Sequence, residues 1–228
     1  MYWQDEDEIN STQVPDDVVD LLFQLSGREL PCDHAWQLMG AIREILPWFG
    51  GDPSLGLHLI YPAPSGNGWY SPSDMAAETM YLPRRAKLGL RLPKAMVDAA
   101  RDLEESELHV GDFKLTIGKS DIRLLSLHTT LNARHVLSAE GAESEADFLD
   151  WASDRFSAMG VTARRMVVGR TTILHRDQSK LVTRSLMLAD LKPRESLQVQ
   201  RQGLGDERRL GCGLFIPHKS VRNIIEEG

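Results

Sequence analysis

The alternation of hydrophobic and polar positions along the first half of the chain predicts a β-α-β-β-α-β order. Residues 18–25 (VVDLLFQL) are an apolar run typical of a strand. In residues 33–46 the apolar side chains recur at helical spacing, with Asp33 as the expected N-cap and Pro47 as the expected stop. The other predicted elements are strands at 56–63, 78–82, 86–93, 113–118 and 121–127, a glycine- and proline-rich loop at 64–72, and a helix at 94–105.

The second half of the chain repeats this order. Its first helix is predicted to begin with a capping box from Ser144 to Asp147 and to end at Gly160. The other predicted elements are a strand at 131–138, a long hairpin at 163–191, a short polar helix from Pro193 and a last strand at 212–217. We therefore predict an α+β fold of two tandem ferredoxin-like (RRM-like) βαββαβ domains with a C-terminal glycine-rich loop. The predicted limits are 1–16 for a disordered acidic arm, 17–127 for the first domain and 128–228 for the second.

Composition agrees with a globular protein of two domains. The chain has 228 residues, of which 42% are hydrophobic, enough to give each half its own core. Its sequence contains no apolar run of about 20 residues and no secretory signal at its start, so we expect a cytoplasmic protein without a membrane partner. Cys32 and Cys212 are far apart and lack neighbouring metal ligands, so we expect free thiols, no metal and no cofactor.

Charge is distributed unevenly along the chain. The formal net charge is -7, and the first twenty residues carry seven acids and no lysine or arginine. Between Arg164 and Lys219 there are twelve basic and five acidic residues, a balance of +7. The second half therefore carries a basic field suited to nucleic acid, although any single arginine there is more often a solvated surface charge.

The sequence GLGDERRLGCG, residues 203–213, contains four glycines and two arginines near the end of the chain. A dinucleotide fingerprint is excluded, since Arg208 stands where its third glycine is needed, and the Walker sequence GK[ST] is absent. A plain turn remains an alternative, because glycine mostly indicates positive φ or close backbone approach.

The pattern G-L-G, a five-residue basic insert and G-C-G before an apolar strand resembles the glycine-rich loop of the RAMP superfamily of CRISPR-associated proteins. Residues 18–42 (VVDLLFQLSGRELPCDHAWQLMGAI) resemble the first strand, turn and helix of the precursor-crRNA processing endoribonucleases of that superfamily, and LPWF and LPRRAKLGLRLP resemble their continuing core. The likeness covers roughly residues 18–217. It implies a tandem RRM-like fold and metal-independent cleavage of CRISPR repeat RNA, leaving a 2',3'-cyclic phosphate and a 5'-hydroxyl. It also implies retention on the crRNA 3' stem-loop and association with other Cas subunits of an effector complex.

The resemblance assigns the catalytic role to His34. Cleavage needs a group that accepts the proton of the 2'-hydroxyl, and the positive end of a helix disfavours imidazolium while it attracts phosphate. A packing or capping histidine is the alternative interpretation of His34. Among the other histidines, His58, His109 and His135 lie in predicted strands and are expected to be structural, and the sequence leaves His128 and His175 open.

RNA contacts are expected from the hairpin, from the glycine-rich loop and from the basic segment before residue 88, because A-form RNA is gripped through phosphates and 2'-hydroxyls. No supporting electrophile can be assigned from the sequence. The expected RNA-binding residues are Arg84, Arg85, Lys87, Arg164, Arg165, Arg170, Arg176, Lys180, Arg184, Gly203, Gly205, Arg208, Arg209, Gly211 and Gly213.

Two other functions remain open at this point. One is a module that binds repeat RNA without cutting it, as a subunit of a CRISPR or transposon-linked targeting complex. The other is a two-histidine RNA phosphoesterase, because His128 and His218 each begin an H-x-[ST] motif. Against this function, Pro217 is a poor residue for the strand that would orient His218.

Overall fold

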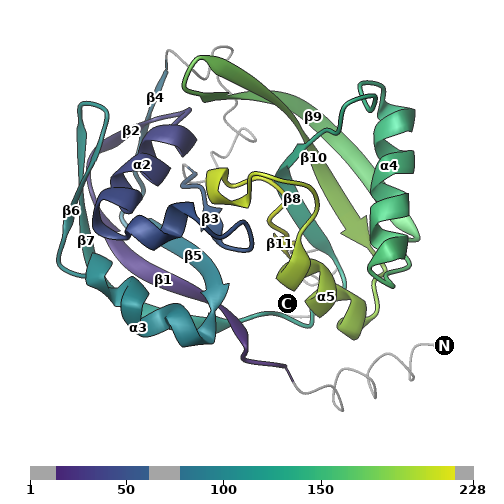
Figure 1. Cartoon of the computed structure of the whole chain (residues 1–228), viewed down its shortest axis with the longest axis horizontal. Coiled ribbons are helices and arrows are strands. Elements are labelled where there is room, and N and C mark those ends of the chain that lie inside the picture. Colours follow the sequence, from purple (N-terminus) through teal and green to yellow (C-terminus); the bar gives the residue numbers. More distant parts are fainter. Residues whose placement is uncertain (1–13, 62–77, 219–228) are drawn as a thin grey trace, which may run out of the picture.

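Two large antiparallel sheets with helices packed against them, and one small two-stranded sheet, make up the part of the chain described by the computed structural model, residues 14–61 and 78–218 (Figure 1). The first half contains β1 (Val18–Ser26), β2 (Glu29–Pro31), α2 (Ala35–Ile45), β3 (Gly56–His58), β4 (Thr79–Tyr81), β5 (Lys87–Pro93), α3 (Val97–Ala100), β6 (Glu107–Val110) and β7 (Phe113–Leu124). The second half contains β8 (Leu131–Leu137), α4 (Glu145–Ala158), β9 (Arg165–Arg176), β10 (Ser179–Ala189), α5 (Pro193–Gln202) and β11 (Ile216–Pro217).

The strand orders confirm the predicted tandem ferredoxin-like fold. The first sheet has the order β3-β5-β1-β7-β6, and the second has the order β11-β8-β10-β9. In the first sheet β1 lies between β5 and β7, and in the second sheet β8 lies between β10 and β11, which is the ferredoxin-like arrangement. Strand β6 is an additional strand at one edge of the first sheet. The predicted domain limits, 17–127 and 128–228, stay a prediction, and residues 1–13 of the expected arm and the expected loop at 64–72 lie outside the described residues.

Several predicted elements of the first half are wrong in detail. The predicted strands 113–118 and 121–127 are one strand, β7, because a register shift opposite Phe23 and Leu25 lets the pairing with β1 continue. The helix predicted at 94–105 is broken into a 3₁₀ turn, the four-residue α3 and a second 3₁₀ turn. The strand predicted at 56–63 ends at His58, and β4 pairs with β2 in a separate two-stranded sheet.

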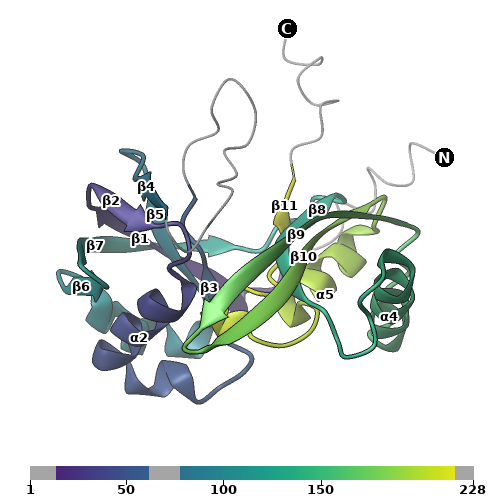
Figure 2. The same ribbon diagram turned by 90° about the horizontal axis from the view of Figure 1, so that it is seen from above.

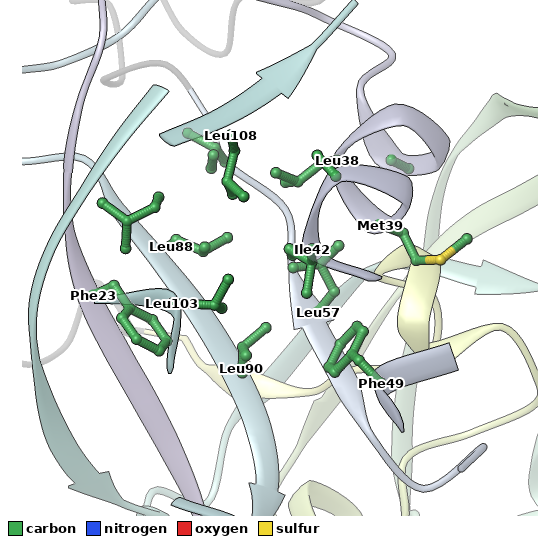
Figure 3. Close-up of a cluster of buried hydrophobic side chains, with 14 of the residues drawn as sticks. Phe23, Leu38, Met39, Ile42, Phe49, Leu57, Leu88, Leu90, Leu103 and Leu108 are labelled. Atoms are coloured by element: carbon green, nitrogen blue, oxygen red, sulfur yellow. The ribbon is translucent and has the colours of Figure 1, made fainter. Parts of the chain in front are cut away.

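The helices of the first half cover one face of its sheet. Val19, Leu21 and Phe23 alternate along β1 and are fully buried, as the strand period of two predicts. Figure 3 shows Phe23 among leucines of the neighbouring strands and facing the apolar side of α2, which carries Leu38 and Ile42. A second core joins α4 to the second sheet and contains Phe148, Ala152, Phe156, Leu186 and Leu188.

The β9–β10 hairpin connects the two halves. Between Arg184 and Leu186 the register of β10 shifts against both β8 and β9, each of which carries one extra residue. Such bulges bend a sheet and increase its twist. Figure 2 shows the hairpin running from the second sheet toward α2. Near the tip of the hairpin, the paired residues Leu174 and Leu181 are buried in the core of the first half.

A buried ion pair lies at the centre of the first sheet. Arg91 of β5 donates from Nε to Asp20 Oδ1 at 2.7 Å and from Nη2 to Oδ2 at 3.0 Å, and the two side chains are 1% and 3% exposed. The Arg91 Nη1 atom donates to the carbonyl oxygens of Gln200 and Phe215, both at 2.9 Å. One guanidinium group therefore joins the first sheet to α5 and to the segment before β11. Within the described residues, no helix is long and apolar enough to cross a membrane.

We expect Arg91→Ala to destabilise the protein by about 3–5 kcal/mol, because it leaves the Asp20 carboxylate buried without its main partner. The matched control is Arg123→Ala: Arg123 also donates to Asp20, at 2.9 Å, but is 52% exposed. Its loss should cost less than about 1 kcal/mol. Urea unfolding of both variants measures the difference, and equal losses would contradict the central role of Arg91.

Candidate functional site

His34 lies at the N-terminus of α2 as its N-cap residue, one position later than the predicted cap. Asp33 instead accepts hydrogen bonds from the backbone N–H of His175, at 2.9 Å, and from its Nδ1, at 2.6 Å. This contact ties the end of the β9–β10 hairpin to the start of α2. The sequence prediction that His34 stands at the beginning of this helix is therefore correct, and the predicted capping role of Asp33 is wrong.

Both ring nitrogens of His34 are engaged by the backbone. Nδ1 lies 2.9 Å from the Pro31 carbonyl oxygen and 3.2 Å from that of Cys32, and Nε2 accepts from the Ile60 N–H at 3.1 Å. These partners assign the proton to Nδ1 and leave Nε2 as the basic nitrogen. The residue is 2% exposed, and burial lowers its pKa to about 4, against the opposing effect of the two carbonyls. His34 is neutral at pH 7, mainly because it is desolvated.

The residues after β3 bring further groups to His34. Ile60 provides the N–H that His34 accepts, and the next side chain, Tyr61, meets two residues of β8. The Arg134 guanidinium carbon lies 3.7 Å from the centre of the Tyr61 ring, and the His135 ring is stacked on Tyr61 at a centroid distance of 6.2 Å and an angle of 15°. The segment 59–61 thus joins the N-terminus of α2 to the first strand of the second half.

The glycine-rich loop packs tightly between the two halves. The loop carries positive φ at all four of its glycines. A Cβ atom at Gly213 would lie 2.2 Å from the Leu204 oxygen, one at Gly203 would lie 2.5 Å from the Gly213 oxygen, and one at Gly211 would lie 2.4 Å from Leu59. The first two approaches are backbone contacts within the loop that only glycine allows, and the third places Gly211 against Leu59, in the segment that carries Ile60 and Tyr61.

The two arginines of the loop make structural contacts. Arg208 is 6% exposed, and its Nη1 donates to the carbonyl oxygens of Arg201 and Gln202 at the end of α5. Arg209 donates to the Gly50 oxygen. The expectation that Arg208 presents its guanidinium group to RNA is therefore corrected: the uncapped carbonyls of α5 bind it inside the protein. Gly203 and Gly213 are likewise buried, whereas Gly205 is exposed and Gly211 is half-buried.

The basic residues of the hairpin do not form one surface. Arg184 lies on the α4 face, where it donates to the Glu143 oxygen and lies over the Phe148 ring, and Arg165, paired with Ala189 in the register, faces the other way. Arg165 forms an ion pair with Asp190 at 3.1 Å, and Arg176 pairs with Glu207 of the glycine-rich loop. The exposed basic residues of the hairpin region that have no ion pair within the described part of the chain are Arg164, Arg170 and Lys180.

Arg84, Arg85 and Lys87 are exposed on the turn that leads into β5. The two H-x-[ST] motifs do approach each other: Pro217 pairs with Leu131, and the His218 N–H donates to the Thr130 oxygen at 3.0 Å. Pro217, judged a poor strand residue from the sequence, thus lies in the two-residue strand β11. The second motif ends at Ser220, outside the described residues.

Three features of the junction were not expected from the sequence: the Asp20–Arg91 pair, Tyr61 and Arg134. The sequence did contain a signal for the Asp20–Arg91 pair, because each of the two apolar strand sequences, VVDLLFQL and LGLRLP, contains a single charged residue. Tyr61 had none, since it meets β8 only through the fold. Within the described ranges, no three His, Cys, Asp or Glu side chains gather as metal ligands.

The strand orders of the two sheets define a tandem ferredoxin-like protein. Among solved structures, the chain is similar to a "CRISPR associated protein Cas6" (TM-score 0.60, 10% identity, 89% of this chain and 100% of that one). It is also similar to "An RAMP protein binding different RNA substrates" (TM-score 0.55, 13% identity, 88% and 100%).

Sequence comparisons show the family to which the chain belongs. The family model "Cas6 Crispr" matches residues 19–220. The "CRISPR-associated endonuclease Cas6" of Myxococcus xanthus (strain DK1622) is 32% identical over 210 residues, which cover 92% of this chain and 86% of that protein. The chain belongs to the Cas6 family.

We expect Gly213→Ala to lower the free energy of unfolding by about 3 kcal/mol or more, because the new Cβ meets the Leu204 oxygen and φ is +66°. Gly160→Ala is the matched control, since φ there is +74° and nothing lies within 4 Å of the added atom. It should cost about 1–2 kcal/mol, the left-handed strain alone. Denaturant unfolding compares the two, and a Gly213 variant as stable as the Gly160 variant would refute the close approach.

Stability should fall as the pH is lowered from about 6.5 toward 4. Burial lowers the pKa of His34, and burial with the charge of Arg134 lowers that of His135, each to about 4. The unfolded chain therefore binds protons in this window that the native protein excludes. The slope of unfolding free energy against pH should become shallower by about one proton in His34→Gln. An unchanged slope in the His34 variant would contradict this.

Proposed function

We propose that this Cas6-family protein binds the stem-loop of a CRISPR repeat and cleaves precursor crRNA beside His34, without a metal ion or another cofactor. The observation that carries the proposal is the state of His34: it is neutral, its Nδ1 proton is held by two carbonyl oxygens, and its basic Nε2 points to the junction of the two halves. Neutrality and a fixed tautomer are what a general base requires.

The reaction follows from that geometry. The 2'-hydroxyl replaces the Ile60 N–H as the partner of Nε2 and transfers its proton there. The 2'-oxygen attacks the adjacent phosphorus, the bond to the 5'-oxygen breaks, and that oxygen takes up a proton. The products are a 2',3'-cyclic phosphate and a 5'-hydroxyl, and the histidine returns to its neutral form once its proton is released.

Binding of the stem-loop is assigned to the exposed basic residues on the hairpin and on the turn before β5, which can contact phosphates at modest desolvation cost. Gly205 and Gly211 are the loop glycines with exposed surface. The proposed contacts are Arg84, Arg85, Lys87, Arg164, Arg170 and Lys180, with Arg165, Arg176 and Arg184 available where RNA displaces their present partners. We further propose that the protein acts in the cytoplasm, stays on the crRNA 3' stem-loop and joins other Cas subunits.

One observation favours a second function. His34 is 2% exposed, and both of its nitrogens already have partners. A protein that kept this arrangement with RNA bound would be a repeat-binding subunit without cleavage activity. The two functions differ in whether RNA displaces the Ile60 N–H.

The deciding experiment incubates the protein with synthetic CRISPR repeat RNA in EDTA. We expect cleavage that persists in EDTA, stops when the scissile nucleotide is 2'-deoxy, and yields a cyclic phosphate by mass spectrometry. His34→Ala should lower the single-turnover rate by about 10²-fold or more while affinity is kept, as for loss of a general base. Tight binding with intact RNA would instead support the non-cleaving subunit.

A further inference from the structure

The junction contains an arginine whose position is defined by aromatic rings. Arg134 belongs to β8, where a register shift against β10 falls between Ala133 and Val136. Its guanidinium carbon lies 3.7 Å from the centre of the Tyr61 ring, which is the distance of a cation–π contact. Arg134 is half-buried.

The Tyr61 ring that contacts Arg134 is itself held in place by His135. His135 is stacked on it, and His135 Nδ1 lies 3.1 Å from the Thr183 hydroxyl oxygen. That hydroxyl donates to the Thr172 carbonyl oxygen at 2.9 Å, so it accepts the proton from Nδ1. A chain of contacts therefore runs from the β9–β10 hairpin through His135 and Tyr61 to the guanidinium group.

A short series of contacts connects this arginine to His34. Tyr61 follows Ile60, whose N–H is bound to His34 Nε2, the nitrogen proposed to accept the 2'-hydroxyl proton. His34 and Arg134 both lie near enough to His135 for a positive charge on either of them to lower the pKa of His135. The cation is thus supplied by the second half to a site whose base is supplied by the first.

Three other arginines near the junction bind groups of the protein itself. Arg208 binds the carbonyl oxygens at the end of α5, Arg209 binds the Gly50 oxygen, and Arg123 is paired with Asp20. Transfer of a phosphoryl group to a 2'-oxygen places extra negative charge on the phosphate oxygens and on the leaving 5'-oxygen, and a preorganised cation lowers the barrier most when water is largely excluded.

We propose that Arg134 is the catalytic cation of the cleavage site and donates to the scissile phosphate as charge develops in the transition state. Tyr61 is a positioning residue that holds the guanidinium plane, and His135 holds Tyr61. This role rests on the proposed RNA cleavage and adds a residue from the second half to a reaction otherwise assigned to the first. Because the planar guanidinium stacks on a ring, lysine is a poor substitute.

The test is single-turnover cleavage of synthetic CRISPR repeat RNA at saturating protein, with affinity measured separately on RNA that is 2'-deoxy at the scissile nucleotide. Arg134→Ala should lower the rate about 10²- to 10³-fold, the effect of removing one transition-state donor, while the Kd changes by less than about threefold. Arg134→Lys should recover only part of the rate, and added guanidinium ion should partly rescue the alanine variant. Arg155→Ala, an exposed arginine of α4 that is not among the proposed RNA contacts, should leave both the Kd and the saturated rate unchanged.

Two substitutions of Tyr61 distinguish a positioning role of its ring from a chemical role of its hydroxyl. Tyr61→Phe keeps the ring and should cut at close to the wild-type rate, and Tyr61→Ala should lose rate as Arg134→Ala does. A Phe variant as slow as the Ala variant would refute the positioning role.

Arg134 variants with normal melting curves and an unchanged saturated rate would overturn the proposal while leaving the cleavage activity in place. A wild-type protein that binds repeat RNA without cutting it is a different result, and it would overturn the proposed cleavage as well.

Discussion

The bidentate pair between Asp20 and Arg91 is the interaction on which the arrangement of the molecule depends. Burial by itself would raise the pKa of Asp20, but the charges of His58 and Arg91 hold it well below its usual range. A buried carboxylate that stays ionised requires its partners, so β1, β3 and β5 must be in register. The same guanidinium binds two carbonyl oxygens of the second half, and the pair therefore specifies both the first sheet and how α5 meets it.

The junction built on this pair explains why the site is both ordered and closed. Segment 59–61 follows β3, lies against Gly211, and brings Ile60 to His34 and Tyr61 to β8. These contacts remove water from His34, which keeps it neutral, and they also occupy the nitrogen that a base must offer. The contacts that orient the His34 ring thus also block access to its Nε2 atom. The proposed activity therefore requires the RNA 2'-hydroxyl to take the place of the Ile60 N–H.

Charge counted along the sequence is a poor guide to the individual contacts of the basic residues. The twelve basic residues between Arg164 and Lys219 led to the expectation of an RNA partner, and the chain belongs to the Cas6 family. The individual residues have several roles. The register of the hairpin places Arg165 of β9 and Arg184 of β10 on opposite faces of the sheet, and Arg208 is buried where it binds the carbonyl oxygens of α5. A basic count cannot distinguish an arginine that caps a helix from one that faces solvent.

By itself, the sequence determined the βαββαβ order of each half, the capping box at Ser144, the start of α2 near His34 and the family signature of the glycine-rich loop. These depend on local periodicity, on capping chemistry and on backbone conformations that glycine adopts, all of which are written in neighbouring residues. Only the tertiary structure decided that Arg208 is buried, that His34 is closed by Ile60, and that Tyr61, Arg134 and His135 meet. Each of these contacts joins residues brought together by sheet register and by the packing of one half on the other, so the energy that selects them is absent until the chain has folded.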